Sequence, residues 1–197
     1  MASSSPVSWR GWEPQLRTVL KMLHLRKYTN VTPLMQGSED ALLVCSARNY
    51  AGATLVQVYF LSEKKVGVKT FRKISQECEA MSCQHLILVT EEGLTPFASK
   101  EVEDTEKFPA GFVTEVFKKK ELCFCIMEHS LVPPHTLLSS CEKKELLQKL
   151  SCKTSALPKI KETDPVCKFM HFQAGSVLRI DRQIGSCPEV YYRLVCQ

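Results

Sequence analysis

The sequence has no apolar run that approaches the roughly 18 residues of a membrane-spanning helix. Its opening residues, Met-Ala-Ser-Ser-Ser-Pro, also lack the basic and then apolar order of a secretory signal peptide. We therefore expect no signal peptide and no membrane contact. The remaining composition, with 44% hydrophobic and 24% charged residues, is typical of a globular protein.

The ten cysteines lack the spacing of a zinc site, because no two of them form a Cys-x-x-Cys knuckle. A secreted protein held together by disulfides would be smaller and richer in turns. We therefore expect reduced thiols that act as small hydrophobic side chains, with no bound metal and no cofactor. Cys123 and Cys125 alternate within an apolar run, which predicts that they share one face of a strand.

Two common catalytic signatures are missing as well. The sequence has no glycine-rich phosphate loop. It also has no Gly-x-Ser-x-Gly elbow for a serine nucleophile. The histidines and cysteines show no local pairing that would activate a thiol. We therefore expect a chain with no catalytic residues.

The spacing of apolar residues predicts a mixture of helices and strands in the first two thirds of the chain. The expected elements are an amphipathic helix ending near Tyr28, a loop over 32–40, strands over 41–45 and 54–61, a helix over 70–81, a strand over 85–90, a helix over 110–120 and a strand over 122–127. Thr95 can also cap a helix with Pro96 at its first position. Alternating strands and helices are the order of an α/β fold.

This order of elements is that of a restriction-nuclease-like fold. Such enzymes carry an acidic residue on one strand, and a Glu or Asp, one further residue and a Lys on the next, to bind a divalent metal. Asp40 lies just before the first strand, but the strand over 55–60 has no carboxylate and no Lys, and Glu63 follows that strand. Metal-dependent cleavage is therefore disfavoured. A nuclease-fold enzyme with a relocated metal-binding carboxylate site is the alternative function.

The stretch 157–197 has its own pattern of start and stop signals. Residues 157–160 are expected to be extended, since Pro158 disfavours a helix there. Asp164 followed by Pro165 predicts the start of a helix of about two turns, which ends before Gly175. Strands are expected over 176–180 and 190–195. A module of this size is suited to docking rather than to a large active-site cleft.

We therefore expect an N-terminal domain over 1–130, a bridging segment over 131–156 and a small C-terminal domain over 157–197. The fold class is α/β in the first domain and mixed α+β in the last. The net charge of +5 suits a protein that works near nucleic acid.

Several motifs occur in a fixed order along the chain. They are Lys65-Val66-Gly67-Val68-Lys69-Thr70, Gly93-Leu94-Thr95-Pro96-Phe97-Ala98, Leu131-Val132-Pro133-Pro134-His135, Leu157-Pro158-Lys159-Ile160 followed by Asp164-Pro165-Val166, and the final Tyr192-Arg193-Leu194-Val195. Together they resemble the fifth subunit shared by the eukaryotic nuclear RNA polymerases, which is similar to a small subunit of the archaeal polymerase. The resemblance runs from about Leu42 to the last residue. The first helix matches more weakly, through His24, Arg26 and Tyr28.

The resemblance implies a restriction-nuclease-like jaw domain and a C-terminal assembly domain. It implies a non-catalytic subunit that docks on the largest subunit of the polymerase and contacts other polymerase subunits. The jaw would lie along the downstream double-stranded DNA. The chain would then be one part of a multisubunit complex, not a homo-oligomer. Its location would be the nucleus if the protein is cellular rather than viral.

Two groups of site residues follow from this resemblance. The DNA-proximal residues are Thr95, Pro96, Phe97 and Ala98, where a helix N-terminus and a hydroxyl can meet a phosphate. The partner-binding residues are Leu157, Pro158, Ile160, Asp164, Pro165, Tyr191, Tyr192 and Arg193. A sheet edge can accept a strand from a partner, and Tyr and Arg are enriched in interfaces.

The sequence departs from the family at three places in the last domain. Met170 and His171 stand where the family has an aromatic residue and Gly, which predicts a costly positive φ at His171. Gln173 and Ala174 replace a basic pair. The segment 185–190 is one residue shorter than in the family. We therefore expect an altered partner surface, as in a paralogue serving one polymerase class or in a viral or protist version.

Overall fold

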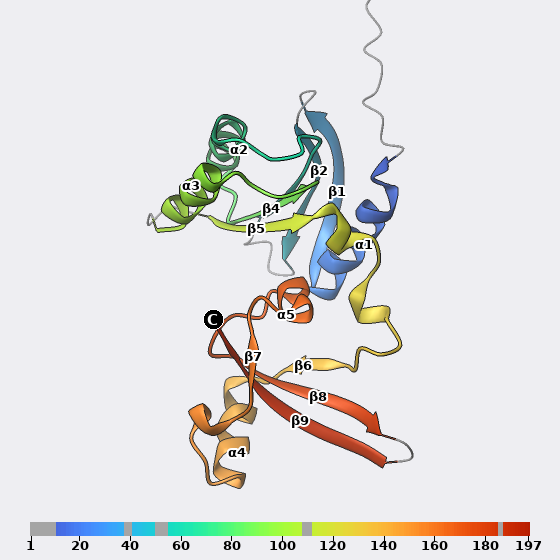
Figure 1. The fold of residues 1–197 in the computed structure, drawn as a ribbon, viewed down its shortest axis with the longest axis vertical. Helices are drawn as coiled ribbons and strands as arrows, with labels where there is room; N and C mark the ends of the chain where they lie inside the picture. The colour runs from blue at the N-terminus through green and yellow to red at the C-terminus, as the bar shows by residue number, and fades with distance from the viewer. Residues whose placement is uncertain (1–10, 38–40, 50–54, 108–111, 185–186) are drawn as a thin grey trace, which may run out of the picture. The chain divides into compact units, whose positions relative to one another are not determined.

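The computed structural model of this chain describes residues 11–37, 41–49, 55–107, 112–184 and 187–197. The chain divides into two compact units, Met1–Phe124 and Cys125–Gln197. Each unit combines helices with a sheet (Figure 1), which confirms the mixed α+β class. Across the part of the chain that the structure describes, no helix is long and apolar enough to cross a membrane.

The first unit contains a five-stranded sheet with the strands in chain order. They are β1 (Tyr28–Gly37), β2 (Ala41–Asn49), β3 (Leu55–Leu61), β4 (His85–Thr90) and β5 (Val113–Lys118). β1, β2 and β3 pair antiparallel, whereas β3, β4 and β5 pair parallel. The parallel connections run through α2 (Val68–Ala80) and α3 (Pro96–Lys107), which lie on the same side of the sheet (Figure 1). The predicted alternation of strands and helices is therefore present from β3 to β5.

Both faces of the central strands are covered, which explains why these strands are continuously apolar. Phe71 and Ile74 of α2 share a core cluster with Tyr59 of β3. On the opposite face, Trp12 precedes α1 (Glu13–Leu25) and meets Phe60 edge to face, with ring centroids 5.3 Å apart. Every residue of β4 is buried. The predicted helix over 70–81 and strand over 85–90 are thus confirmed.

The loop expected over 32–40 is wrong, because β1 continues to Gly37. Pro33 lies opposite Cys45 in this strand, and the register shifts between Pro33 and Gln36. β1 is the edge strand of the sheet. An edge position tolerates a proline, since its missing N–H need not remove a ladder hydrogen bond. Asp40 lies outside the described residues.

The helix expected over 110–120 is also wrong, because β5 occupies most of this range. The spacing of Val113, Val116 and Phe117 imitates the apolar stripe of a helix. Pairing with β4, which sets Val113 opposite His85, instead selects a strand. β-branched residues suit such a position. Residues 108–111 lie outside the described residues.

Two short 3-10 helices, η2 (Lys119–Leu122) and η3 (Ile126–Glu128), replace the strand expected over 122–127. Glu121 accepts a hydrogen bond from the Lys118 N–H at 3.2 Å, which closes the first of these turns. Leu122 is buried. Cys123 and Cys125 therefore alternate in sequence but do not share the face of a strand.

The second unit contains a four-stranded sheet with the order β6-β8-β9-β7. Its strands are β6 (His135–Leu137), β7 (Lys159–Lys161), β8 (Val177–Ile184) and β9 (Cys187–Cys196). β8 and β9 form an antiparallel hairpin, and a three-residue strand pairs with each of its sides. The strands expected over 176–180 and 190–195 are present and longer than predicted.

Two helices, α4 (Ser140–Lys149) and α5 (Pro165–Met170), cover the two faces of this hairpin. Leu146 of α4 shares a core cluster with Val177, and Cys167 of α5 shares another with Leu178. Val177 and Leu178 are neighbours in one strand, so their side chains point to opposite faces. Residues 131–156, expected as a bridge, supply β6 and α4 to this unit.

Candidate interaction sites

The first candidate site is the turn Thr95–Ala98, which begins α3 at the carboxyl end of the parallel strands. The hydroxyl oxygen of Thr95 accepts a hydrogen bond from the Ala98 N–H at 3.3 Å, which confirms the predicted helix cap. The Thr95 N–H donates to the Val66 carbonyl at 3.0 Å. Gly93 turns the chain just before it, at φ 112°. The turn is thus fixed by backbone and side-chain hydrogen bonds.

Exposure divides the four predicted DNA-proximal residues. Phe97 is 79% exposed, and Pro96 beside it is exposed as well. Thr95 is half-buried, whereas Ala98 is fully buried. Ala98 therefore anchors the turn, and the other three residues form its accessible surface. The Thr95 hydroxyl can still donate its hydrogen to a phosphate oxygen.

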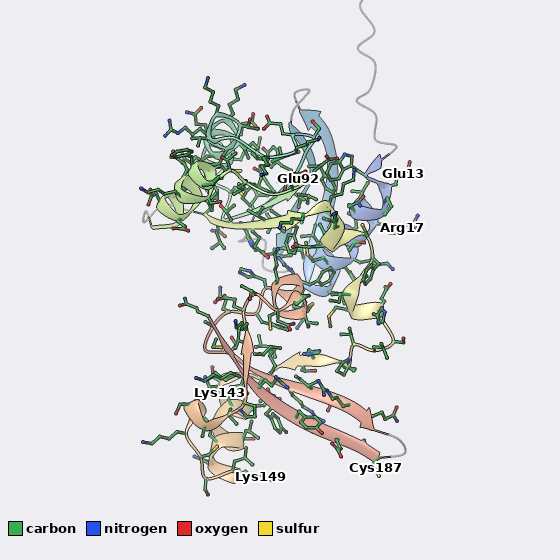
Figure 2. The ribbon with its side chains drawn as sticks, in the orientation of Figure 1. Glu13, Arg17, Glu92, Lys143, Lys149 and Cys187 are labelled. Carbon is green, nitrogen blue, oxygen red and sulfur yellow. The ribbon has the colours of Figure 1, made fainter. Side chains whose placement is uncertain are left out.

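Charged groups of both signs lie at the same end of the strands. Lys119 packs its Nζ atom 4.1 Å from the centre of the Trp12 ring and 3.4 Å from a carboxylate oxygen of Glu91. This contact gives the centre of the basic run Lys118–Lys120 a structural role. Glu92, labelled in Figure 2, donates its N–H to the Lys64 carbonyl at 2.9 Å and so joins the loops after β3 and β4.

The carboxylate considered for a nuclease site is engaged elsewhere. Glu63 follows β3 and accepts a hydrogen bond from the Thr70 hydroxyl at 2.8 Å, near the start of α2. The middle of β3 carries Gln57, which is fully buried. Its amide oxygen accepts from the Cys78 thiol at 3.0 Å. Glu63 therefore lies outside β3, and the middle of β3 carries an amide where a nuclease would carry a metal-binding carboxylate.

The sequence did not predict a buried charged network between the end of α1 and the sheet. Arg26 donates two hydrogen bonds to the carboxylate of Glu115 on β5, at 2.7 and 2.8 Å. The two side chains are only 4% and 9% exposed. His85 Nε2 lies 2.5 Å from the same carboxylate, and the Tyr28 hydroxyl lies 3.3 Å from His85 Nδ1.

This network explains part of the match in the opening helix. Burial raises the pKa of Tyr28 above its ordinary value, because the phenolate would lose its hydration. Arg26 and Tyr28 belong to the weaker match of the first helix, and Glu115 lay in a segment that the sequence assigned to a helix. Its pairing with Arg26 could be found only once β5 was placed beside β4.

The second candidate site lies in the C-terminal unit and begins at α5. Asp164 Oδ1 accepts a hydrogen bond from the Val166 N–H at 2.9 Å, and Pro165 is the first helical residue. These contacts confirm the predicted helix start. His171 ends the helix at φ 55°, as its place in the sequence predicts.

The predicted partner-binding residues differ in their access to solvent. Pro158, Pro165 and Tyr191 are exposed, whereas Ile160, Asp164, Tyr192 and Arg193 are half-buried. Leu157 is only 6% exposed and shares a core cluster with Leu146. Leu157 therefore holds the unit together and offers little surface to a partner.

Arg193 finds a hydrogen-bond acceptor within its own chain. Its guanidinium donates to the Lys159 carbonyl at 3.2 Å and so joins β9 to β7. Lys159 and Lys161 are exposed on β7. On α4, Lys143 donates to the Gly175 carbonyl at 2.7 Å, and Lys149 extends from the same helix (Figure 2).

A groove of about 720 Å³ lies beside the hairpin of the second unit. The segment 130–134 forms one wall, and Asp181, Arg182, Gln183 and Pro188 form the other. Leu131 is 84% exposed at this place. The Leu-Val-Pro-Pro-His motif of this segment contributed to the family resemblance, but the sequence did not predict a groove here.

These features define a class of protein first: a mixed α+β chain of two units whose exposed turn and hairpin suit contacts with other macromolecules. A family model described as RNA polymerase Rpb5, C-terminal domain, matches residues 124–195. Together with relatives that are 30% identical and match 99% of this chain, this finding shows that the chain belongs to the Rpb5 family. This finding confirms the resemblance inferred from the motifs.

Similar proteins from three organisms support this assignment. Proteins named DNA-directed RNA polymerases I, II, and III subunit RPABC1, from Caenorhabditis briggsae and Caenorhabditis elegans, are each 30% identical over 214 residues. These matches cover 99% of this chain and 100% of each relative. A protein of the same description from Dictyostelium discoideum is 31% identical over 173 residues, covering 84% of this chain and 87% of the relative.

Proposed function

We propose that this chain is a subunit of a multisubunit DNA-directed RNA polymerase and that it serves assembly and DNA contact rather than catalysis. The observation that carries the proposal is the match over 99% of the chain to relatives named as polymerase subunits. The match covers both structural units, and the family model falls on the second. The working location would be the nucleus, with the chain joined to other subunits instead of to copies of itself.

The C-terminal unit is proposed to dock on the largest subunit of the polymerase. Tyr191 is 38% exposed on β9, and Pro158 and Pro165 are exposed near β7 and α5. Aromatic side chains are enriched at the centres of interfaces, and proline adds surface without further loss of backbone freedom. Arg193 keeps its remaining N–H donors available for a partner while it holds the Lys159 carbonyl.

The first unit is proposed to lie along downstream double-stranded DNA. Thr95, Pro96 and Phe97 form an accessible turn that is held rigidly by Val66 and Ala98. A rigid turn with a hydroxyl donor is suited to a phosphate contact, which positions a duplex without reading its sequence. This surface would meet DNA of any sequence as it enters the enzyme.

A non-catalytic role is part of the same proposal. Glu63 is bound to Thr70, and β3 presents Gln57 where a nuclease would carry a carboxylate. No observation favours the nuclease alternative. The purified chain is expected to leave duplex DNA intact in the presence of magnesium or manganese.

Co-purification tests the assembly proposal. The tagged full chain, expressed in its own cells, is expected to recover the largest polymerase subunit, identified by mass spectrometry. Arg193→Ala is expected to weaken incorporation by about 2–5 kcal/mol if the guanidinium is desolvated at the interface. The matched control Lys149→Ala, on exposed α4, should incorporate normally.

A thermal melt of each purified variant separates docking from folding. Loss of incorporation by a normally folded Arg193→Ala protein supports the interface. Normal incorporation would remove Arg193 from it, and recovery of no polymerase subunit by the unmodified chain would overturn the proposed function. In the recovered enzyme, a photo-crosslinker at position 97 should reach the downstream DNA strand.

A further inference from the structure

Helix α2 ends in a motif that brings two cysteines together. The Cys83 N–H donates to the Cys78 carbonyl at 2.8 Å, and the Ser82 N–H donates to the Glu79 carbonyl at 3.0 Å. Ser82 between them has a left-handed backbone, at φ 53°. This is the hydrogen-bond pattern of a Schellman motif, which usually sets its first and last side chains in contact. Here those side chains are both thiols.

The two side chains belong to the same core cluster, between α2 and the sheet. The Cys78 thiol also lies 3.0 Å from the Gln57 amide oxygen, and the Cys83 thiol lies 3.1 Å from the His85 carbonyl. The hydrogen bond from the Cys83 N–H to the Cys78 carbonyl, combined with standard bond lengths, limits the separation of the Cα atoms of Cys78 and Cys83 to roughly 7 Å. Disulfides form at Cα separations of about 4.4–6.8 Å, so a bond needs little backbone movement.

We propose that Cys78 and Cys83 are a reversible modification site, at which a peroxide converts the two thiols into a disulfide. The site lies between α2 and β4 in the first unit and is separate from the turn proposed to meet DNA. Both cysteines are reduced in the structure. The substrate class is hydrogen peroxide or a small organic peroxide.

Cys83 is the residue that reacts first. It keeps 7% of its surface exposed, whereas Cys78 is completely buried. The hydrogen bond with Cys78 lowers the pKa of Cys83, and the same hydrogen bond and burial raise the pKa of Cys78. Since the thiolate is the nucleophile, the lower pKa favours attack by Cys83.

With hydrogen peroxide the reaction balances in two steps, and an organic peroxide gives an alcohol in place of the first water. The Cys83 sulfur attacks one peroxide oxygen, the O–O bond breaks, and the products are a sulfenic acid at Cys83 and one molecule of water. The Cys78 sulfur then displaces hydroxide from the sulfenic sulfur, and the hydroxide leaves as a second water with the Cys78 proton. Two thiols lose two electrons and two protons, and one peroxide is reduced.

Reversal by a thiol reductant follows from the same contacts. The disulfide has no S–H group, so Gln57 and the His85 carbonyl each lose a donor that they have in the reduced protein. Gln57 is fully buried, and loss of a buried partner is costly. The surroundings therefore favour the reduced pair once the peroxide is gone.

The chain contains two matched controls for this site. α4 ends in the same motif with Leu147 and Cys152 at the paired positions, and α5 with Cys167 and Phe172. Each control has one thiol where α2 has two. Burial raises the pKa of Cys167 to about 11, which further protects it from oxidation.

The experiment uses the full reduced chain and hydrogen peroxide under native conditions. The peroxide is then removed, the chain is denatured, and the remaining thiols are blocked with a maleimide before digestion. Trypsin releases residues 74–100, a peptide that contains Cys78 and Cys83 and no other cysteine. A second digestion after Glu79 cuts the chain between them, so its products stay joined only through a disulfide.

We expect this peptide to lose two hydrogens, to escape the maleimide and to stay joined after cleavage at Glu79. Dithiothreitol should restore both thiols. Cys152 and Cys167 should form no disulfide within their own helix-end motifs, since each motif has only one thiol. In Cys78→Ser, a dimedone adduct should mark the sulfenic acid at Cys83. A wild-type peptide that retains two labelled thiols, at a peroxide dose that oxidises the exposed Cys123 and Cys141, would overturn the proposal.

Discussion

Ser82, Ser151 and His171 follow α2, α4 and α5 with left-handed backbones, at φ 53°, 48° and 55°. An L-residue with a side chain pays roughly 1–2 kcal/mol for this conformation, and glycine is the usual residue at such a position. Two backbone hydrogen bonds hold each of the three turns. Each position therefore stores a small strain that the rest of the helix end compensates.

At the residue scale, we predict that Ser82→Gly stabilises the protein. Glycine relieves the left-handed strain but loses more freedom on folding, so the expected net gain in the free energy of unfolding is about 0.5–1 kcal/mol. Urea denaturation, followed by circular dichroism, measures the change. Ser155→Gly is the control, since Ser155 is exposed and its φ is not positive. A gain of equal size in the control would show that backbone strain at Ser82 is not the cause.

At the element scale, a buried ion pair between Arg26, which follows α1, and Glu115 of β5 joins the end of this helix to the sheet. We predict that Arg26→Met lowers the free energy of unfolding by about 3–5 kcal/mol, because Glu115 would lose its two guanidinium hydrogen bonds in a buried setting. Thermal and urea denaturation measure this loss. The double variant Arg26→Met with Glu115→Leu should recover part of it, since no carboxylate is then left buried.

Arg72 provides the control for this prediction. It forms a similar bidentate pair with Glu101, between α2 and α3, but the two side chains are 64% and 32% exposed. This pair lowers the pKa of Glu101, yet solvent screens its contribution to stability. Arg72→Met is expected to change stability far less than Arg26→Met. Equal losses in both variants would contradict the role assigned to burial.

The elements that the sequence predicted well carry their signals locally. β4 is a continuous apolar run, and α5 begins at the Asp164-Pro165 pair. The elements predicted wrongly depend on distant partners. Pro33 suggested a loop until β1 was seen to pair with β2 as an edge strand, and β5 became a strand through its pairing with β4. Local spacing cannot reveal which distant segment completes a sheet.

The candidate sites show the same division. Thr95 and Asp164 were predicted from capping chemistry, which acts over two or three residues, and both form their caps. The burial of Ala98 and Leu157 was not predictable, because it depends on how each helix or strand packs. Cys78 and Cys83 have no known metal or redox spacing. Their proximity follows from the left-handed turn at Ser82.

At the scale of the whole molecule, the division into two units predicts where a protease will cut. The sequence predicted a bridging segment over 131–156, but within it Cys152 packs against a core cluster of the second unit, and 154–156 form a 3-10 helix. The boundary between the units follows Phe124, which is 58% exposed, and Leu131 nearby is 84% exposed.

We therefore predict that limited chymotrypsin digestion cuts first between Phe124 and Leu131 and leaves a stable C-terminal fragment. Intact mass measurement of early digestion products locates the cut. Trypsin serves as the comparison, with Lys153 as an exposed site inside the second unit. First cleavage within 151–156 by both enzymes would contradict this placement of the boundary.

The two outer strands of the second sheet are only three residues long, and β7 carries Lys159 and Lys161 exposed. Short, lysine-bearing borders discourage the strand-to-strand stacking that starts fibrils. A chain synthesised before it joins its partners would therefore stay monomeric, because the lysines on this edge strand repel those of another copy. The short edge strands leave little backbone for a partner to pair with, and for the same reason they protect the unassembled protein from aggregation.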